Sequence, residues 1–344
     1  METVVTCKRT STPMNNPIDE KEGPGPDRGR RLCLIAAIAA GALMLAACST
    51  APQAASTSTG AGIPLGAAAP RAADMLHGSY VALGDSYTAG PGIPDQTGAV
   101  AGCEQSSSSY PFLVAQRLRL ELTDMSCSSA TIADLSAAQP TGDGINPAQL
   151  SALSSSTALV TLGIGGNDIG WASIVTRCVE LDLIPVLIPG ENTSGLTPCE
   201  DYYFRDGMDL IQQRIQVVSG QLAKTLSQIK ARARRARVYV VGYPDLLPSS
   251  GNGCANTLGM TTGDIVFLNN EELRLNGELR QVAQAVGDGY VDTYRPSEGH
   301  DACSAPPSRW IEPLIPDATA APLHPNTVGE QGMANAIVAA VNSD

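Results

Sequence analysis

Ser86 stands in a sequence context that could make a serine hydroxyl reactive. A short apolar run, Tyr80 to Leu83, leads directly into Gly84-Asp85-Ser86-Tyr87, which predicts a sharp turn at the end of a buried strand. A serine at such a turn can expose its Oγ to a substrate while its backbone N–H points into the same site. Because a serine hydroxyl is a poor nucleophile unaided, this chemistry requires a general base nearby.

The chain has three histidines that could act as this base: His77, His300 and His324. His324 lies just before the last helical stretch, in a loop that the following Pro325 biases away from helix. His77 precedes the first strand, so it should lie at the opposite end of that strand from Ser86. His300 falls in a predicted loop at the rim of the site. We therefore predict that His324 is the base, with His300 as the alternative.

Short strands that alternate with longer helices must bring these residues together. The predicted strands are brief, apolar runs bounded by Gly, Pro or Asp: Tyr80 to Leu83, Leu159 to Leu162, Val238 to Val241 and Tyr290 to Val291. The predicted helices are Pro111 to Leu122, Arg205 to Arg235 with a break at Gly220, Asp264 to Val286, and Thr327 to Val341. This alternation predicts an α/β fold with a parallel sheet covered by helices on both faces. Open sheets of this kind carry their chemistry at the carboxyl ends of the strands.

Composition and charge exclude several classes of function. The 344 residues are 43% hydrophobic and 16% charged, as in a globular protein, and the net charge of -12 disfavours binding to nucleic acid or to anionic lipid. Gly163-Ile164-Gly165-Gly166 follows a predicted strand but lacks the third glycine of a dinucleotide-binding motif. We therefore expect no nucleic-acid partner, and any attachment to a membrane must be apolar or covalent.

The first 47 residues have the pattern of an export signal. Arg28, Arg30 and Arg31 precede the apolar run from Leu32 to Ala47, which is too short for a typical membrane-spanning helix. The run ends in Leu45-Ala46-Ala47-Cys48, similar to a bacterial lipobox, whose cysteine becomes lipidated.

We therefore expect residues 1–47 to be a signal peptide with a lipobox, 48–76 a flexible tether, and 77–344 one folded domain. The protein would be exported and then either anchored by lipid at Cys48 to the outer face of the cell membrane, or secreted. An ordinary signal peptide and a twin-arginine signal at Arg30-Arg31 are the alternatives.

The cysteine count agrees with export. Of nine cysteines, Cys7, Cys33 and Cys48 lie in the leader or at its end, which leaves an even set of six. Six cysteines permit fifteen connectivities. Pairing of neighbours along the chain gives Cys103 with Cys127, Cys178 with Cys199, and Cys254 with Cys303, which we take as the first expectation. A zinc site is the competing interpretation, but no pair has the C-x-x-C spacing that usually presents two thiolates to one metal.

Four short sequence blocks resemble those of a known family. Gly84-Asp85-Ser86-Tyr87, Cys127-Ser128-Ser129-Ala130-Thr131, Gly165-Gly166-Asn167-Asp168 and His324-Pro325 follow one another in the order of the four blocks of the GDSL or SGNH hydrolases. The sequence from His77 onward resembles the actinobacterial secreted esterase and lipase branch in particular. The resemblance implies a three-layer α/β/α sandwich with a central parallel sheet, which is the flavodoxin-like SGNH hydrolase fold, for the domain at 77–344.

The resemblance also implies a role for each block. Ser86 would be the nucleophile and His324 the general base. The backbone N–H groups of Ser86 and Ser129 and the side-chain amide of Asn167 would form the oxyanion hole. No metal and no organic cofactor is implied.

Two positions depart from the family pattern. The second block normally has glycine where this chain has Ser129, so a serine must adopt the local backbone geometry. The aspartate that often lies three residues before the catalytic histidine is replaced by Ala321, and we expect the main-chain carbonyl of Ala321 to orient the imidazole in a Ser-His dyad. Asp317 is the alternative orienting group.

The expected function is hydrolysis of carboxylic esters through an acyl-enzyme at the cell envelope or outside the cell, with a lipid or a small ester as the acyl-ester substrate. The alternatives are a carbohydrate acetyl esterase, and an inactive surface lipoprotein that binds lipid or glycan. We expect a monomer whose contact with the membrane is its N-terminal lipid anchor.

Overall fold

The structure is a computed structural model that describes residues 78–343, except for residue 101 and residues 188–194. The predicted signal peptide, Cys48, the tether and His77 lie outside the described residues. None of the helices in the described part of the chain combines the length and apolar character needed to cross a bilayer.

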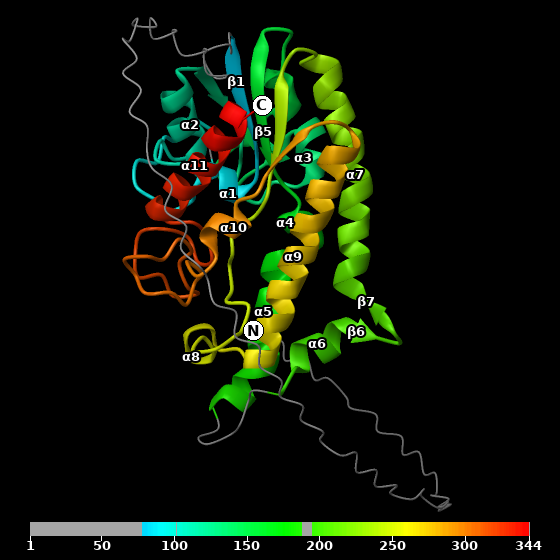
Figure 1. The fold of residues 1–344 in the computed structure, drawn as a ribbon, viewed down its shortest axis with the longest axis vertical. Coiled ribbons are helices and arrows are strands. Elements are labelled where there is room, and N and C mark those ends of the chain that lie inside the picture. The colour runs from blue at the N-terminus through cyan, green and yellow to red at the C-terminus, as the bar shows by residue number, and fades with distance from the viewer. Residues whose placement is uncertain (1–77, 101, 188–194, 344) are drawn as a thin grey trace, which may run out of the picture. The chain divides into compact units, whose positions relative to one another are not determined.

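Five parallel strands form the central sheet (Figure 1). They are β1 (Ser79–Gly84), β2 (Glu121–Asp124), β5 (Thr157–Gly163), β8 (Arg237–Val241) and β9 (Gly289–Val291), in the spatial order β2-β1-β5-β8-β9. Four of them are the predicted strands. The fifth, β2, corrects the sequence analysis, because the helix predicted to reach Leu122 ends at Leu118, where Arg119 takes a left-handed conformation as its C-cap.

Helices cover both faces of the sheet. The α-helices are α1 (Ser86–Ala89), α2 (Tyr110–Leu118), α3 (Ile132–Ser136), α4 (Gly166–Ile169), α5 (Trp171–Leu187), α6 (Pro198–Tyr203), α7 (Leu210–Arg232), α8 (Ala255–Leu258), α9 (Thr262–Ala285), α10 (Tyr294–Ser297) and α11 (Thr327–Ser343). A 3₁₀ helix, η2, spans Gln149–Ala152. The helix α7 runs through Gly220 without the predicted break. It begins at Leu210, and the segment from Arg205 to Asp209, which was predicted as its start, instead belongs to a hairpin of β6 (Phe204–Arg205) and β7 (Met208–Asp209).

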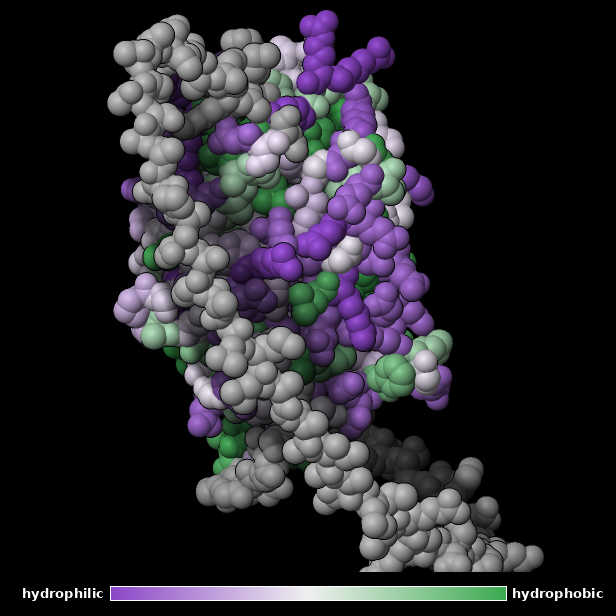
Figure 2. Space-filling view, viewed as in Figure 1, coloured by the Kyte–Doolittle hydropathy of each residue, from purple (hydrophilic) through white to green (hydrophobic). Residues whose placement is uncertain are grey.

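The alternation of side chains along the strands separates two apolar cores. Val81 and Leu83 of β1 pack with residues of α3, α5, α7 and α9, whereas Tyr80 and Ala82 pack with α2 and α11. Figure 1 shows α2 and α11 on one side of the sheet and α7 and α9 on the other. The outward faces of α7 and α9 are mainly polar (Figure 2). The described residues therefore form the expected three-layer α/β/α sandwich.

The structure contains the three predicted disulfides, Cys103–Cys127, Cys178–Cys199 and Cys254–Cys303. The first bond joins the segment before α2 to the loop that leaves β2. Because that loop continues directly into Ser128 and Ser129, this disulfide restrains a segment of the candidate site. A small antiparallel hairpin of β3 (Gln139–Pro140) and β4 (Ile145–Asn146) follows α3.

Candidate active site

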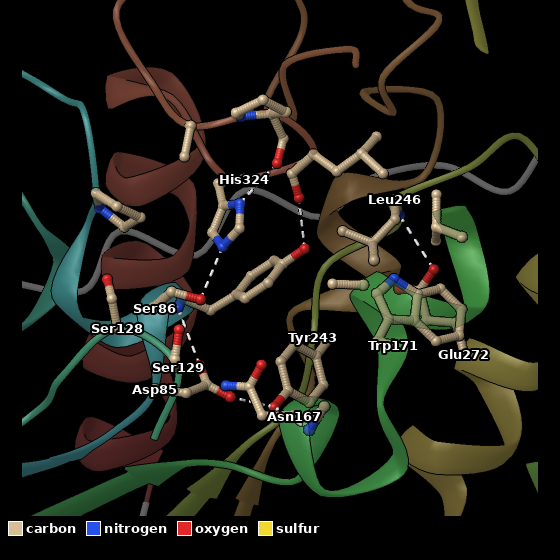
Figure 3. A pocket seen from close by; sticks show the side chains of 18 of the residues that line it. Asp85, Ser86, Ser128, Ser129, Asn167, Trp171, Tyr243, Leu246, Glu272 and His324 are labelled. Atoms are coloured by element: carbon tan, nitrogen blue, oxygen red, sulfur yellow. Dashed lines mark hydrogen bonds between the residues drawn. The ribbon is translucent and has the colours of Figure 1, made fainter. Parts of the chain in front are cut away.

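The candidate residues meet at the carboxyl ends of the central strands. Ser86 follows β1, Ser129 follows β2, and Asn167 follows β5. All three line one cavity, and the fourth block reaches it through the loop that carries His324 before α11. Figure 3 shows Ser86 and His324 facing each other, with Ser129 and Asn167 beyond Ser86 in this view. The four sequence blocks therefore converge in one site.

The turn before Ser86 is held by close backbone contacts. The side-chain amide of the buried Gln149 donates to the carbonyl of Gly84 at 2.9 Å and accepts from its N–H at 2.8 Å. A Cβ at Gly84 would lie 2.2 Å from Thr88 Oγ1 and 2.5 Å from the Gly163 carbonyl oxygen, so only glycine fits there. Asp85 then caps α1 by accepting from the Tyr87 N–H at 3.0 Å. Ser86 is consequently fixed at the first position of α1.

His324 contacts Ser86 directly. Its Nε2 lies 2.7 Å from Ser86 Oγ, and its Nδ1 lies 2.7 Å from the carbonyl oxygen of Pro322. The ring of Tyr87 lies against the imidazole with 4.8 Å between centroids, and the Tyr87 hydroxyl donates to the Leu323 carbonyl. A proton on Nδ1 satisfies the Pro322 carbonyl and leaves Nε2 as the acceptor of the Ser86 hydroxyl proton.

The orienting group differs from the prediction. The carbonyl of Ala321 accepts from the backbone N–H of His324 at 3.2 Å, which closes a tight turn and leaves the Pro322 carbonyl beside the ring. The prediction of the Ala321 carbonyl was therefore wrong by one residue. The alternative, Asp317, accepts from Arg309 at 2.8 Å and is engaged away from the imidazole.

Burial favours the neutral form of the His324 imidazole. Desolvation lowers the pKa of His324 below 6.5, although the hydrogen bond to the Pro322 carbonyl and the charge of Glu104 act in the opposite direction. Because the neutral form is the one that can accept a proton, the site is set to remain competent in mildly acidic solution.

We expect the acidic limb of the kcat/KM profile to have its midpoint below pH 6.5, since activity is lost only when His324 becomes protonated. The measurement is ester hydrolysis over a pH series that includes this region. Replacing Glu104 by glutamine removes a charge that favours the imidazolium, so E104Q should move the limb to still lower pH. A midpoint above 6.5, or a shift of the E104Q limb to higher pH, would contradict this account.

Three residues that line the cavity carry N–H groups with a proton free for a ligand: Ser86, Ser129 and Asn167. The backbone N–H groups of Ser86 and Ser129 have no acceptor among the residues that the structure describes. The Asn167 side-chain amide donates one proton to the Ala130 carbonyl at 2.9 Å, which orients the amide and leaves its second proton available. Asp168 braces the same loop by accepting from the Ile132 N–H at 3.1 Å. This arrangement can stabilise a developing oxyanion.

Ser129 occupies a conformation that suits glycine better. Its φ of 65° is left-handed, a region that costs a residue with a Cβ about 1–2 kcal/mol. The neighbouring backbone is held on both sides, because Ser128 N–H donates to the Cys103 carbonyl at 3.1 Å and Ala130 N–H donates to the Cys127 carbonyl at 3.1 Å. The serine thus keeps its backbone donor in the site at the expense of local strain.

We expect S129G to raise the free energy of unfolding by about 0.5–1 kcal/mol, because the relief of strain exceeds the added freedom of the unfolded chain. Its kcat/KM should stay within about threefold of the wild type, since the backbone donor is unchanged. S129V, with a β-branched side chain, should lose both stability and activity. Urea denaturation and ester hydrolysis check both variants, and a less stable S129G would contradict the assigned strain.

Tyr243 and Gln149 are site residues that the sequence analysis missed. Tyr243 follows β8, and its hydroxyl donates to Asp85 Oδ2 at 2.6 Å while accepting from the Gly166 N–H at 2.8 Å. Burial raises the pKa of Asp85 to about 7, against the opposing effects of its hydrogen bonds from Tyr243 and Tyr87. The position of Tyr243, just past the carboxyl end of a predicted strand, was the available signal.

The cavity beside Ser86 has a volume of about 360 Å³. Beyond the polar groups around Ser86, its walls are largely apolar and include Val175 of α5, Leu275 of α9, Leu246 and Leu314. The site can therefore accommodate an apolar group attached to the atom that Ser86 attacks.

The other candidates lie elsewhere. His300 Nδ1 contacts the Ser308 carbonyl oxygen, and its ring stacks on Trp310, so it takes no part in the contact with Ser86. No group of three or more His, Cys, Asp or Glu side chains in the described ranges is arranged to hold a metal ion.

Comparison with known proteins agrees with this geometry. The GDSL-like lipase/acylhydrolase family profile matches residues 82–331. Lipase 2 of Streptomyces coelicolor is 38% identical over 257 residues, covering 74% of this chain and 83% of that protein. A phospholipase A1 structure from Streptomyces albidoflavus NA297 has 28% identity and a TM-score of 0.61, covering 78% of this chain and 99% of that one. An extracellular lipase structure from Streptomyces rimosus has 27% identity and a TM-score of 0.61, covering 76% and 99%. The chain therefore belongs to the GDSL-like lipase/acylhydrolase family and is a carboxylic ester hydrolase.

Proposed function

We propose that the protein hydrolyses acyl esters through a Ser86–His324 dyad and a covalent acyl-enzyme. The observation that carries this proposal is the contact of 2.7 Å between His324 Nε2 and Ser86 Oγ, in a site where the Pro322 carbonyl fixes the other ring nitrogen. A carbonyl replaces the carboxylate of a complete triad, so the imidazole is oriented without a negative charge beside it.

The reaction proceeds in two halves. His324 accepts the hydroxyl proton as Ser86 Oγ attacks the ester carbonyl carbon, and the oxyanion of the tetrahedral intermediate binds the N–H groups of Ser86, Ser129 and Asn167. The imidazolium then gives its proton to the leaving alcohol, and the acyl group remains on Ser86. In the second half His324 removes a proton from water, which attacks the acyl-enzyme and releases the carboxylic acid.

The walls of the cavity support a substrate with an acyl chain longer than acetyl. Apolar side chains such as Val175, Leu246 and Leu275 offer surface that a methyl group would leave mostly uncovered. An esterase or lipase acting on lipid or small acyl esters fits this cavity better than a carbohydrate acetyl esterase does.

A chain-length series separates these two substrates. We expect kcat/KM for p-nitrophenyl esters to rise from acetate to medium-length acyl groups, and we expect little release of acetate from acetylated xylan. An optimum at acetate together with rapid deacetylation of the glycan would overturn the proposed substrate class. Absence of any ester hydrolysis by the folded protein would favour an inactive binding protein instead.

We also propose that the protein acts outside the cytoplasm, tethered by a lipid on Cys48. Support comes from the lipobox-like sequence before Cys48, from the three disulfides, and from the relative in Streptomyces rimosus that is an extracellular lipase. Expression of the full chain in an actinobacterial host tests the anchor. The wild type should be found in the membrane fraction and C48A in the soluble fraction or medium, and equal distribution of the two would contradict lipidation at Cys48.

A further inference from the structure

The oxyanion hole is assembled from turns that follow different strands. Ser86 follows β1 and Asn167 follows β5, and each turn also includes a residue immediately before the donor, Asp85 and Gly166 respectively. Donors that stabilise an oxyanion must be held to within a few tenths of an ångström, because the rate depends steeply on their position. The groups that fix the two turns relative to each other should therefore affect the rate of catalysis.

The hydroxyl of Tyr243 joins these two turns. It lies 2.8 Å from the Gly166 nitrogen and 2.6 Å from Asp85 Oδ2. The direction of both bonds follows from the groups present, since the Gly166 N–H can only donate and the single proton of Tyr243 is then left for Asp85. The result is a chain from Gly166 through Tyr243 to Asp85, whose other carboxylate oxygen caps α1 beside Ser86.

Tyr243 is itself held firmly. The side-chain amide of Asn276 on α9 accepts from the Tyr243 N–H at 2.8 Å and donates to its carbonyl at 2.9 Å. The Tyr243 ring packs edge-on against Tyr87 with 5.0 Å between centroids, and Tyr87 in turn contacts His324. A Cβ at Gly166 would lie 3.1 Å from the Tyr243 oxygen, a tight contact that the glycine avoids.

The hydroxyl keeps its proton over the range in which the enzyme would work. Burial raises the pKa of Tyr243 well above 10, and the nearby carboxylate of Asp85 raises it further. Tyr243 is 5% exposed, so water has little access to compete for either bond. The Tyr243 hydroxyl therefore stays protonated, and able to donate to Asp85, in mildly acidic and in neutral solution.

We propose that Tyr243 is a positioning residue for catalysis, whose hydroxyl sets the spacing between the Ser86 N–H and the Asn167 amide in the oxyanion hole. This inference rests on the proposed function, because it assigns Tyr243 a role in the same reaction. It predicts that loss of the hydroxyl acts on the transition state rather than on substrate binding.

The test is the kinetics of Y243F on a p-nitrophenyl ester, with Y80F as the matched control. The Tyr80 hydroxyl is also buried and hydrogen-bonded, to Thr161 at 2.7 Å, but it belongs to the core on the α2 and α11 side of the sheet. We expect kcat of Y243F to fall about tenfold with KM within about twofold of the wild type. Y80F should lose comparable stability in urea denaturation and keep its kcat within about twofold.

A double-mutant cycle with Asn167 makes the test specific. If Tyr243 acts by aligning the oxyanion hole, the tenfold effect of Y243F should shrink to about twofold or less in an N167A background. D85N breaks the same chain at its other end, so it provides a second variant should Y243F fail to fold. D85N should lower kcat similarly and should not add to Y243F.

Two results would overturn the inference: an unchanged kcat in folded Y243F and D85N, or a tenfold effect that is fully additive with N167A. Failure of the proposed function would look different, because N167A and S86A would then hydrolyse esters as well as the wild type does. The four single variants S86A, N167A, D85N and Y243F, assayed together, thus distinguish the two outcomes.

Discussion

S86A is expected to lower kcat/KM for ester hydrolysis by about 10⁵-fold, and H324A by a similar factor. Each substitution removes one side of the 2.7 Å contact, so the remaining residue has no partner with which to start the reaction. The measurement is hydrolysis of a p-nitrophenyl ester under pseudo-first-order conditions, with the folded state of each variant checked by circular dichroism.

The double variant S86A/H324A should be no slower than either single variant. Residues that act as a unit have non-additive effects, and the residual rate then comes from binding and from the oxyanion hole. H300A serves as the control, because His300 stacks on Trp310 and does not contact Ser86. Loss of activity in H300A, or nearly full activity in H324A, would contradict the assignment of the base.

N167A is expected to lower kcat by about 10²–10³-fold, which corresponds to about 3–4 kcal/mol of lost transition-state stabilisation. KM should change little, since the amide interacts more strongly with the oxyanion than with the ground-state carbonyl. The measurement is a full kcat and KM determination on one p-nitrophenyl ester.

The Asn167 amide also donates to the Ala130 carbonyl, so N167A requires a control for disorder of the loop that contains Ser128 to Ala130. Gln139 donates to the Ser128 carbonyl at 2.8 Å and supports the same loop without supplying an N–H group to the site. Q139A should therefore cost less than about tenfold in kcat. Equal losses in N167A and Q139A would show that the amide acts only through the shape of the loop.

The sequence predicted the parts of the fold that repeat a strong local pattern. Fully buried strands such as β5 are short runs rich in apolar and β-branched residues, and long amphipathic helices such as α9 keep their periodicity over many residues. The strand β2 was missed because it lies at the edge of the sheet, where alternate residues are exposed and no apolar run develops. In such a segment the local preferences for helix and for strand are similar, and pairing with the neighbouring strand of the sheet determines the outcome.

For the site too, the sequence predicted the residues that lie in local patterns and missed those whose role depends on distant contacts. Ser86, Ser129, Asn167 and His324 could be selected because each lies in a short block of recognisable order. Tyr243 could not, because its role depends on a hydroxyl reaching two turns that are distant in sequence. The choice between the Ala321 and Pro322 carbonyls likewise depends on the path of a single turn, which residue types alone do not determine.

The identity of the nucleophile can be tested most directly by mass spectrometry of the protein after treatment with a fluorophosphonate. The account predicts one covalent adduct, located by peptide mapping on Ser86, with no adduct in S86A and greatly slowed labelling in H324A. An adduct on another residue, or an unlabelled protein that still hydrolyses esters in the presence of the probe, would contradict it.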